Sequence, residues 1–196
     1  MKTTNKGDNT MNLKELLYND VIPKIKAEDY TSVIGEGYQA KIFDKFVCKK
    51  HRDICFKIFY AGKEYARDEY AILEYAYKLG LSVPKPIELF DEANTYAMEK
   101  ITGYNLEEIT KKGLKLHQDV IDAMTDAIKE VTEVIDHGDL SPRNVMFGDI
   151  DIEQGVIVDA VPYVIDFGYS TIKVNKSSSN EGFKLIQLMK NIKGGK

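Results

Sequence analysis

The sequence predicts a single α+β unit in which short strands come first and a long helix follows. A length of 196 residues with 43% apolar content suits about one domain with its own core. Residues 33–43 have the pattern of a strand, a glycine-bearing turn and a second strand. Apolar residues at helical spacing predict a long amphipathic helix farther along the chain. They are Leu116, Val120, Ile121, Met124, Ile128, Val131 and Ile135.

The segment 53–59 predicts an apolar strand that carries one cationic side chain, Lys57. Strand alternation would place Lys57 on the same face as Cys55 and Phe59. A solvated lysine at the edge of a sheet is the alternative.

A helix is predicted over residues 62–79, which are rich in Glu, Ala, Tyr and Leu and contain no Pro. Glu69 shares a face with the apolar positions of this helix. A carboxylate on the buried side of a helix needs a cation, and Lys57 is the obvious partner. Glu64 and Glu74 are competitors that we expect on solvated faces.

Gly80 ends this helix, and the next segments predict two strands at 81–90 and 95–101. In the second half, short apolar runs predict strands at 145–147, 156–158 and 163–165. A polar stretch and one short helix are expected after Gly168. The apolar positions of that helix are Leu185, Leu188, Met189 and Ile192.

Two short segments indicate the chemistry. They are His-Gly-Asp-Leu-Ser-Pro-Arg-Asn at 137–144 and Ile-Asp-Phe-Gly at 165–168. Phosphoryl transfer requires a carboxylate near the attacking hydroxyl and oxygen ligands for Mg²⁺ around the phosphates. Asp139, Asn144 and Asp166 supply that set. Asp and Asn are common in ordinary turns, so the signal is their order and spacing.

With these motifs the chain resembles the protein-kinase-like superfamily. Among its members it is similar to the small atypical kinases, meaning the RIO family and, more closely, the kinase subunit of the KEOPS tRNA-modification complex. The resemblance extends from roughly Val33 to Ser170. It implies a minimal two-lobed kinase-like fold, with a small antiparallel-sheet N-lobe at 13–102 and a truncated helical C-lobe at 103–196. Residues 1–12 are expected to be a disordered tail.

The resemblance also implies a role for each residue of the C-terminal motifs. Asp139 would orient or deprotonate the acceptor hydroxyl, and His137 would support its loop from behind. Asn144 and Asp166 would bind Mg²⁺. Ser141 stands where typical protein kinases carry a lysine, and RIO-type and KEOPS-type loops also have Ser or Thr there.

In the N-lobe, the resemblance implies that the loop of Gly35 and Gly37 covers the phosphates of ATP. The usual third glycine of this loop is Ala40 here. Lys57, paired with Glu69, would position the α and β phosphates.

At the junction of the lobes, Met98 would guard the back of the adenine pocket. The backbone carbonyl of Glu99 and the amide of Ile101 would hydrogen-bond the adenine, and Gly103 would mark the crossing between the lobes. An edge hairpin without any ligand would have a similar sequence.

Charge and hydropathy restrict the partners. The net charge of −4 gives no overall attraction to nucleic acid, and no apolar run approaches membrane-spanning length. The segment after Thr171 is rich in lysine and could contact RNA or an acidic protein, although such ends are more often simply solvated. We expect a cytoplasmic protein, in the host-cell cytoplasm if it is a viral or secreted one.

The sequence therefore predicts a phosphotransferase that depends on ATP and Mg²⁺. We expect it to phosphorylate Ser or Thr on a protein substrate, itself included, with or without an activating protein partner. The long activation segment and the peptide-binding helices of full protein kinases are missing. Three alternatives stay open, namely a small-molecule kinase of the aminoglycoside or choline type, a switch-like ATPase subunit of a larger complex, and a nucleotide-binding pseudokinase scaffold.

Overall fold

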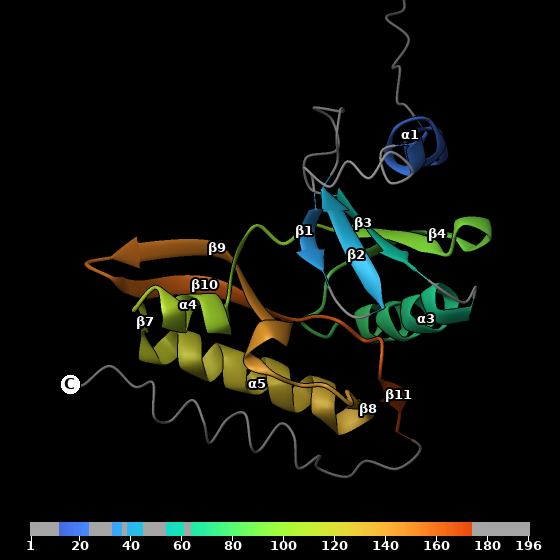
Figure 1. The fold of residues 1–196 in the computed structure, drawn as a ribbon. Coiled ribbons are helices and arrows are strands. Elements are labelled where there is room, and N and C mark those ends of the chain that lie inside the picture. The colour runs from blue at the N-terminus through green and yellow to red at the C-terminus, as the bar shows by residue number, and fades with distance from the viewer. Residues whose placement is uncertain (1–11, 24–32, 37–38, 45–53, 61–63, 174–196) are drawn as a thin grey trace, which may run out of the picture.

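The computed structural model describes residues 12–23, 33–36, 39–44, 54–60 and 64–173. They form two lobes, each with its own sheet, joined by the short segment 100–102 (Figure 1). The predicted two-lobed α+β fold is therefore confirmed. Gly37 and the lysine-rich segment 174–196 lie outside the described residues.

The N-lobe is built on an antiparallel sheet with the strand order β1-β2-β3-β5-β4. These strands are β1 (Val33–Glu36), β2 (Ala40–Asp44), β3 (Ile54–Phe59), β4 (Pro86–Phe90) and β5 (Thr95–Glu99). The predicted hairpin, the Lys57 strand and the two strands before the hinge are all present. β4 begins later than the predicted 81–90, because Pro84 and Pro86 remove backbone donors at its start.

Helices cover both faces of the N-lobe sheet (Figure 1). α3 (Glu64–Lys78), close to the predicted 62–79, packs on one face. On the other face lie α1 (Leu13–Leu16) and a π-helical turn, η1 (Leu17–Val21). This second face forms a separate core cluster of Leu16, Leu17, Val21, Phe43, Phe56, Phe90 and Ala97. Alternation along β3 therefore sends Phe56 toward α1 and Lys57 toward α3.

The C-lobe contains a sheet with the strand order β6-β9-β10-β7, packed against one long helix (Figure 1). Its elements are β6 (Gly103–Asn105), α4 (Leu106–Lys111), β7 (Lys115–Leu116), α5 (Gln118–Val134), β9 (Val145–Glu153) and β10 (Val156–Val164). The predicted strands 156–158 and 163–165 are parts of the single strand β10. Its pairing with β9 shifts register around Asp159, and this irregularity interrupts the alternation that would have revealed one strand.

α5 is slightly shorter than predicted, because its outermost apolar residues belong to neighbouring strands. Leu116 lies in β7, and Ile135 begins β8 (Ile135–Asp136). β8 pairs with β11 (Thr171–Ile172), so the end of α5 is joined to the segment that follows residue 168. The loop at 137–141 starts directly after β8 and leads into the 3-10 turn η4 (Pro142–Asn144). Within the described ranges, no helix has the length and apolar character needed to cross a membrane.

Candidate active site

Three charged side chains meet where the two lobes face each other. Lys57 Nζ lies 2.6 Å from Glu69 Oε1 and 2.7 Å from Asp166 Oδ1. β3 supplies the lysine, α3 the glutamate, and the segment after β10 the aspartate. The side chains of Lys57 and Glu69 are 8% and 1% exposed, whereas that of Asp166 is 45% exposed. The predicted Lys57–Glu69 ion pair is thus present. Asp166 is the partner of this cluster that is exposed to solvent.

Glu69 accepts three hydrogen bonds on one carboxylate oxygen. Besides the ammonium of Lys57, Oε1 accepts the hydroxyl of Tyr96 and the backbone N–H of Phe167, each at 3.0 Å. Tyr96 is not among the site residues predicted from sequence. Its relevance comes from strand register, because Tyr96 on β5 lies directly opposite Lys57 on β3. Sequence alone does not reveal that pairing.

The pKa values of Lys57 and Asp166 are shifted by their surroundings. Burial lowers the pKa of Lys57, but the carboxylates of Glu69 and Asp166 outweigh it and raise that pKa above its ordinary value. Burial also raises the pKa of Asp166, and the attraction of Lys57 outweighs it, so this pKa is lower than usual. Lys57 and Asp166 are therefore both charged at neutral pH.

The stability that Asp166 contributes is expected to disappear on acidification. A carboxyl group whose pKa is lowered by folding stabilises the fold above its ordinary pKa of 3.8 and loses this effect as the pH falls through the lower folded value. The raised pKa of Lys57 gives the opposite dependence on pH. The stability that Lys57 contributes is lost only as the pH rises above its ordinary pKa of 10.5. Urea unfolding of the wild type and Asp166→Asn checks this, since their difference in unfolding free energy should shrink below about pH 4. A difference that stays constant on acidification would contradict the assignment.

The loop before η4 is tied to the Asp166 segment by hydrogen bonds. Asn144 Nδ2 donates to the backbone carbonyl of Asp139 at 2.7 Å and to its Oδ2 at 3.3 Å, which orients the Asp139 carboxylate. His137 is fully buried, and its Nε2 donates to the carbonyl of Ile165 at 3.0 Å. Ser170 Oγ donates to the carbonyl of His137 at 2.9 Å. The structure therefore brings His137 and Asn144 into contact with the segment that carries Asp166, and Asn144 holds Asp139 beside them.

The backbone adopts the left-handed region at two positions of this site. Gly138 has φ 76°, and Asp166 has φ 66°. A Cβ on Gly138 would lie 2.4 Å from the carbonyl oxygen of Tyr169, so only glycine fits there. This region is energetically unfavourable for a non-glycine residue such as Asp166. The ion pair with Lys57 helps to hold Asp166 in this conformation.

Gly138→Ala is expected to distort the Asp139 loop. The added methyl group combines left-handed strain with a clash against a backbone atom, and we expect a loss of roughly 1–3 kcal/mol in unfolding free energy. Gly155→Ala is the matched control, because Gly155 also has a positive φ, of 81°, but nothing lies within 4 Å of its Cβ position. Urea unfolding of both variants checks this. Equal effects of the two substitutions would show that the contact with Tyr169 is unimportant.

The predicted phosphate loop is only partly described. Gly35 lies in β1 against the side chain of Ile42, and Ala40, at the third glycine position, is buried at the start of β2. Gln39 was assigned no role from sequence. Its Oε1 reaches the Asp166 segment, where it lies 3.4 Å from the position that a Cβ on Gly168 would take.

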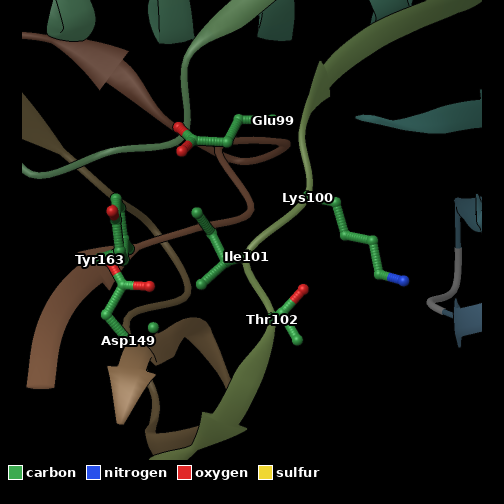
Figure 2. Close-up of a pocket in the computed structure, with 7 residues that line it drawn as sticks. Glu99, Lys100, Ile101, Thr102, Asp149 and Tyr163 are labelled. Atoms are coloured by element: carbon green, nitrogen blue, oxygen red, sulfur yellow. The ribbon is translucent and has the colours of Figure 1, made fainter. Parts of the chain in front are cut away.

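The predicted hinge residues lie beside a small cleft. This cleft lies between the segment that connects the lobes and the β9–β10 hairpin. The cleft measures about 190 Å³ and is lined by Glu99, Lys100, Ile101, Thr102, Gly148, Asp149 and Tyr163. The side chains of Glu99 and Ile101 extend from the hinge segment toward the side where Tyr163 of β10 lies, and Lys100 points to the other side (Figure 2). Met98 packs against the main core. The residues that line this cleft do not include Lys57, Glu69 or Asp166.

The oxygen donors near Asp166 fit Mg²⁺ in combination with phosphates. Among the described residues, no group of three or more His, Cys, Asp or Glu side chains is placed to hold a metal ion. Asn144 uses its amide nitrogen to bond Asp139, which leaves its Oδ1 as an acceptor. An amide oxygen and a carboxylate, completed by phosphate oxygens and water, are ligands that Mg²⁺ accepts.

Comparisons with known proteins agree with this geometry. The RIO domain family model matches residues 38–180. A Rio2 kinase from Chaetomium thermophilum has 17% sequence identity and a TM-score of 0.60, with 92% of this chain and 62% of that chain covered. Its ADP/Mg²⁺-phosphoaspartate complex has 18% identity and a TM-score of 0.54, with 90% and 59% covered.

The chain thus spans about three-fifths of the length of these two structures. No curated protein matches its sequence. The family match covers most of the chain and includes every motif of the C-lobe. The chain therefore belongs to the RIO domain family, and its fold is that of an atypical member of the protein-kinase-like superfamily.

Proposed function

We propose that the chain is a phosphotransferase that uses ATP and Mg²⁺ to phosphorylate Ser or Thr on proteins, itself included. The observation that carries the proposal is the ammonium of Lys57, which is buried and held between Glu69 and Asp166. Such an arrangement presents a fixed positive charge to phosphate groups and is the one that kinases use for the α and β phosphates.

The residues of the C-lobe would act on the acceptor. The Asp139 carboxylate, oriented by Asn144, would accept the proton of the attacking hydroxyl. Asp166 and Asn144 would hold Mg²⁺, which neutralises charge on the phosphates when bound. The relative with ADP, Mg²⁺ and phosphoaspartate supports nucleotide and metal use in this fold.

The test is incubation of the purified chain with γ-labelled ATP and Mg²⁺, alone and with a generic basic protein. Label on protein and release of free phosphate are followed together, and Asp166→Ala serves as a control without the carboxylate that would bind metal. Label that resists hydroxylamine and is lost in Asp166→Ala is the expected result. Its identification as phosphoserine or phosphothreonine would support the assigned acceptor.

Each alternative gives a different result in this assay. Free phosphate without stable label favours the switch ATPase. Label that hydroxylamine removes indicates a phosphoaspartate and not a Ser or Thr product. ATP binding without either signal favours the pseudokinase scaffold, and transfer only to a small alcohol or sugar favours the small-molecule kinase.

We further propose a cytoplasmic protein that acts with a protein substrate or an activating partner. RNA contact through the lysine-rich segment after Thr171 is part of the same proposal. Lys173 lies in the described part of this segment, and its Nζ donates to the carbonyl of Thr132 at 2.6 Å. Filter binding of a short RNA to the full chain at two salt concentrations tests the contact.

A further inference from the structure

Tyr96 is a fully buried tyrosine to which the proposed reaction assigns no role. It lies in β5, two residues before Met98, and is 1% exposed. Its ring packs against Phe59 and Tyr70, with centroid distances of 6.2 Å and 5.7 Å. Phenylalanine would fill this space equally well. The hydroxyl therefore needs a separate explanation.

The hydroxyl of Tyr96 bonds to a charged group of the candidate active site. It donates to Glu69 Oε1 at 3.0 Å. Hydrogen bonds to an ionised carboxylate are stronger than those between neutral groups. Burial and the nearby Glu69 raise the pKa of Tyr96 well above its ordinary value, so the phenol keeps its proton and stays a donor.

The three donors on Glu69 come from three different elements. Lys57 and Tyr96 approach Oε1 from the neighbouring strands β3 and β5, and Phe167 approaches from the Asp166 segment. Glu69 Oε2 is buried and has no hydrogen-bond partner among the described atoms. Without the Tyr96 hydroxyl, Oε1 would accept two hydrogen bonds instead of three, so less would hold the carboxylate in its present orientation. The carboxylate could then rotate away from its present contact with Lys57.

We infer that Tyr96 is a positioning residue, which fixes the Glu69 carboxylate and through it the Lys57 ammonium that binds ATP. The inference rests on the proposed role of Lys57 in binding phosphates. It also gives the β5 strand a second function, because the same strand carries Met98 and Glu99 toward the hinge. The adenine end and the phosphate end of the site would then share one strand.

The test compares Tyr96→Phe with Tyr70→Phe in the full chain. Tyr70 belongs to the same aromatic cluster, but its hydroxyl makes no hydrogen bond to a described residue, so it controls for loss of a hydroxyl in this region. The dissociation constant of ATP with Mg²⁺ is measured by calorimetry, and KM for ATP and kcat are measured by transfer. For Tyr96→Phe we expect the dissociation constant and KM to rise about three- to ten-fold, and for Tyr70→Phe to change less than about two-fold.

A purely structural role would give another result. Irreversible loss of folded protein lowers the number of binding sites and the apparent kcat, but it leaves the dissociation constant of the remaining folded protein unchanged. An unchanged dissociation constant in Tyr96→Phe, or an equal rise in both variants, would overturn the inference.

A double variant tests whether Tyr96 acts through Glu69. If it does, Tyr96→Phe should weaken ATP binding much less in a Glu69→Gln background than in the wild type. Fully additive effects would overturn the inference. The result is separate from the proposed function, because ATP binding without transfer in the wild type refutes the kinase proposal and still leaves this comparison measurable.

Discussion

Replacing Asp139 with asparagine is expected to slow phosphoryl transfer about 100- to 10,000-fold, the usual effect of removing a general base. The amide keeps the shape of the side chain but cannot accept the proton of the attacking hydroxyl. ATP affinity should be nearly unchanged, because the phosphates are expected to bind Lys57 and the metal. Single-turnover transfer and calorimetry with ATP measure the two quantities separately.

Asp136→Asn provides the matched control for this substitution. Asp136 is exposed in β8, one residue before the loop, and the change removes the same charge from the same region. We expect transfer at the wild-type rate. Comparable slowing by both substitutions would point to the net charge of the region, and normal transfer in Asp139→Asn would remove Asp139 from the mechanism.

Lys57→Met is expected to abolish measurable ATP binding and to destabilise the fold. The methionine fills the space of the lysine stem but leaves the Glu69 carboxylate buried without its cation. Breaking a buried ion pair by removing one partner typically costs about 3–5 kcal/mol of unfolding free energy. Urea unfolding and calorimetry with ATP measure the two effects.

The double variant Lys57→Met with Glu69→Leu separates stability from binding. Removal of the unpaired carboxylate should restore much of the lost stability, since apolar replacements of buried ion pairs are often well tolerated. ATP affinity should not return, because the ammonium is still missing. Recovery of ATP binding in the double variant would mean that Lys57 has only a structural role.

The sequence predicted the parts of the site that lie in contiguous motifs or on one regular element. Asp139, Asn144 and Asp166 follow from short segments with fixed spacing, and the Lys57–Glu69 pair follows from strand and helix periodicity. These predictions need no knowledge of which strands are neighbours.

What the sequence did not predict depends on tertiary pairing. Tyr96 resembles an ordinary core tyrosine until the register of β3 and β5 places it opposite Lys57. The continuity of β10 is hidden by a register shift around Asp159. α1 was not assigned, because a segment as short as Leu13–Leu16 shows little helical periodicity, and its stability comes from packing on Phe43 and Phe56.

The single oxygen shared by Lys57, Tyr96 and Phe167 makes thermodynamic linkage between the lobes unavoidable. A ligand that displaces α3 moves Glu69 and must disturb contacts to β3, to β5 and to the Asp166 segment together. Nucleotide affinity would then change, and by reciprocity bound nucleotide would alter the affinity of that ligand by the same factor. Only a protein that binds α3 and displaces it would therefore act as an effector of the site without touching the nucleotide.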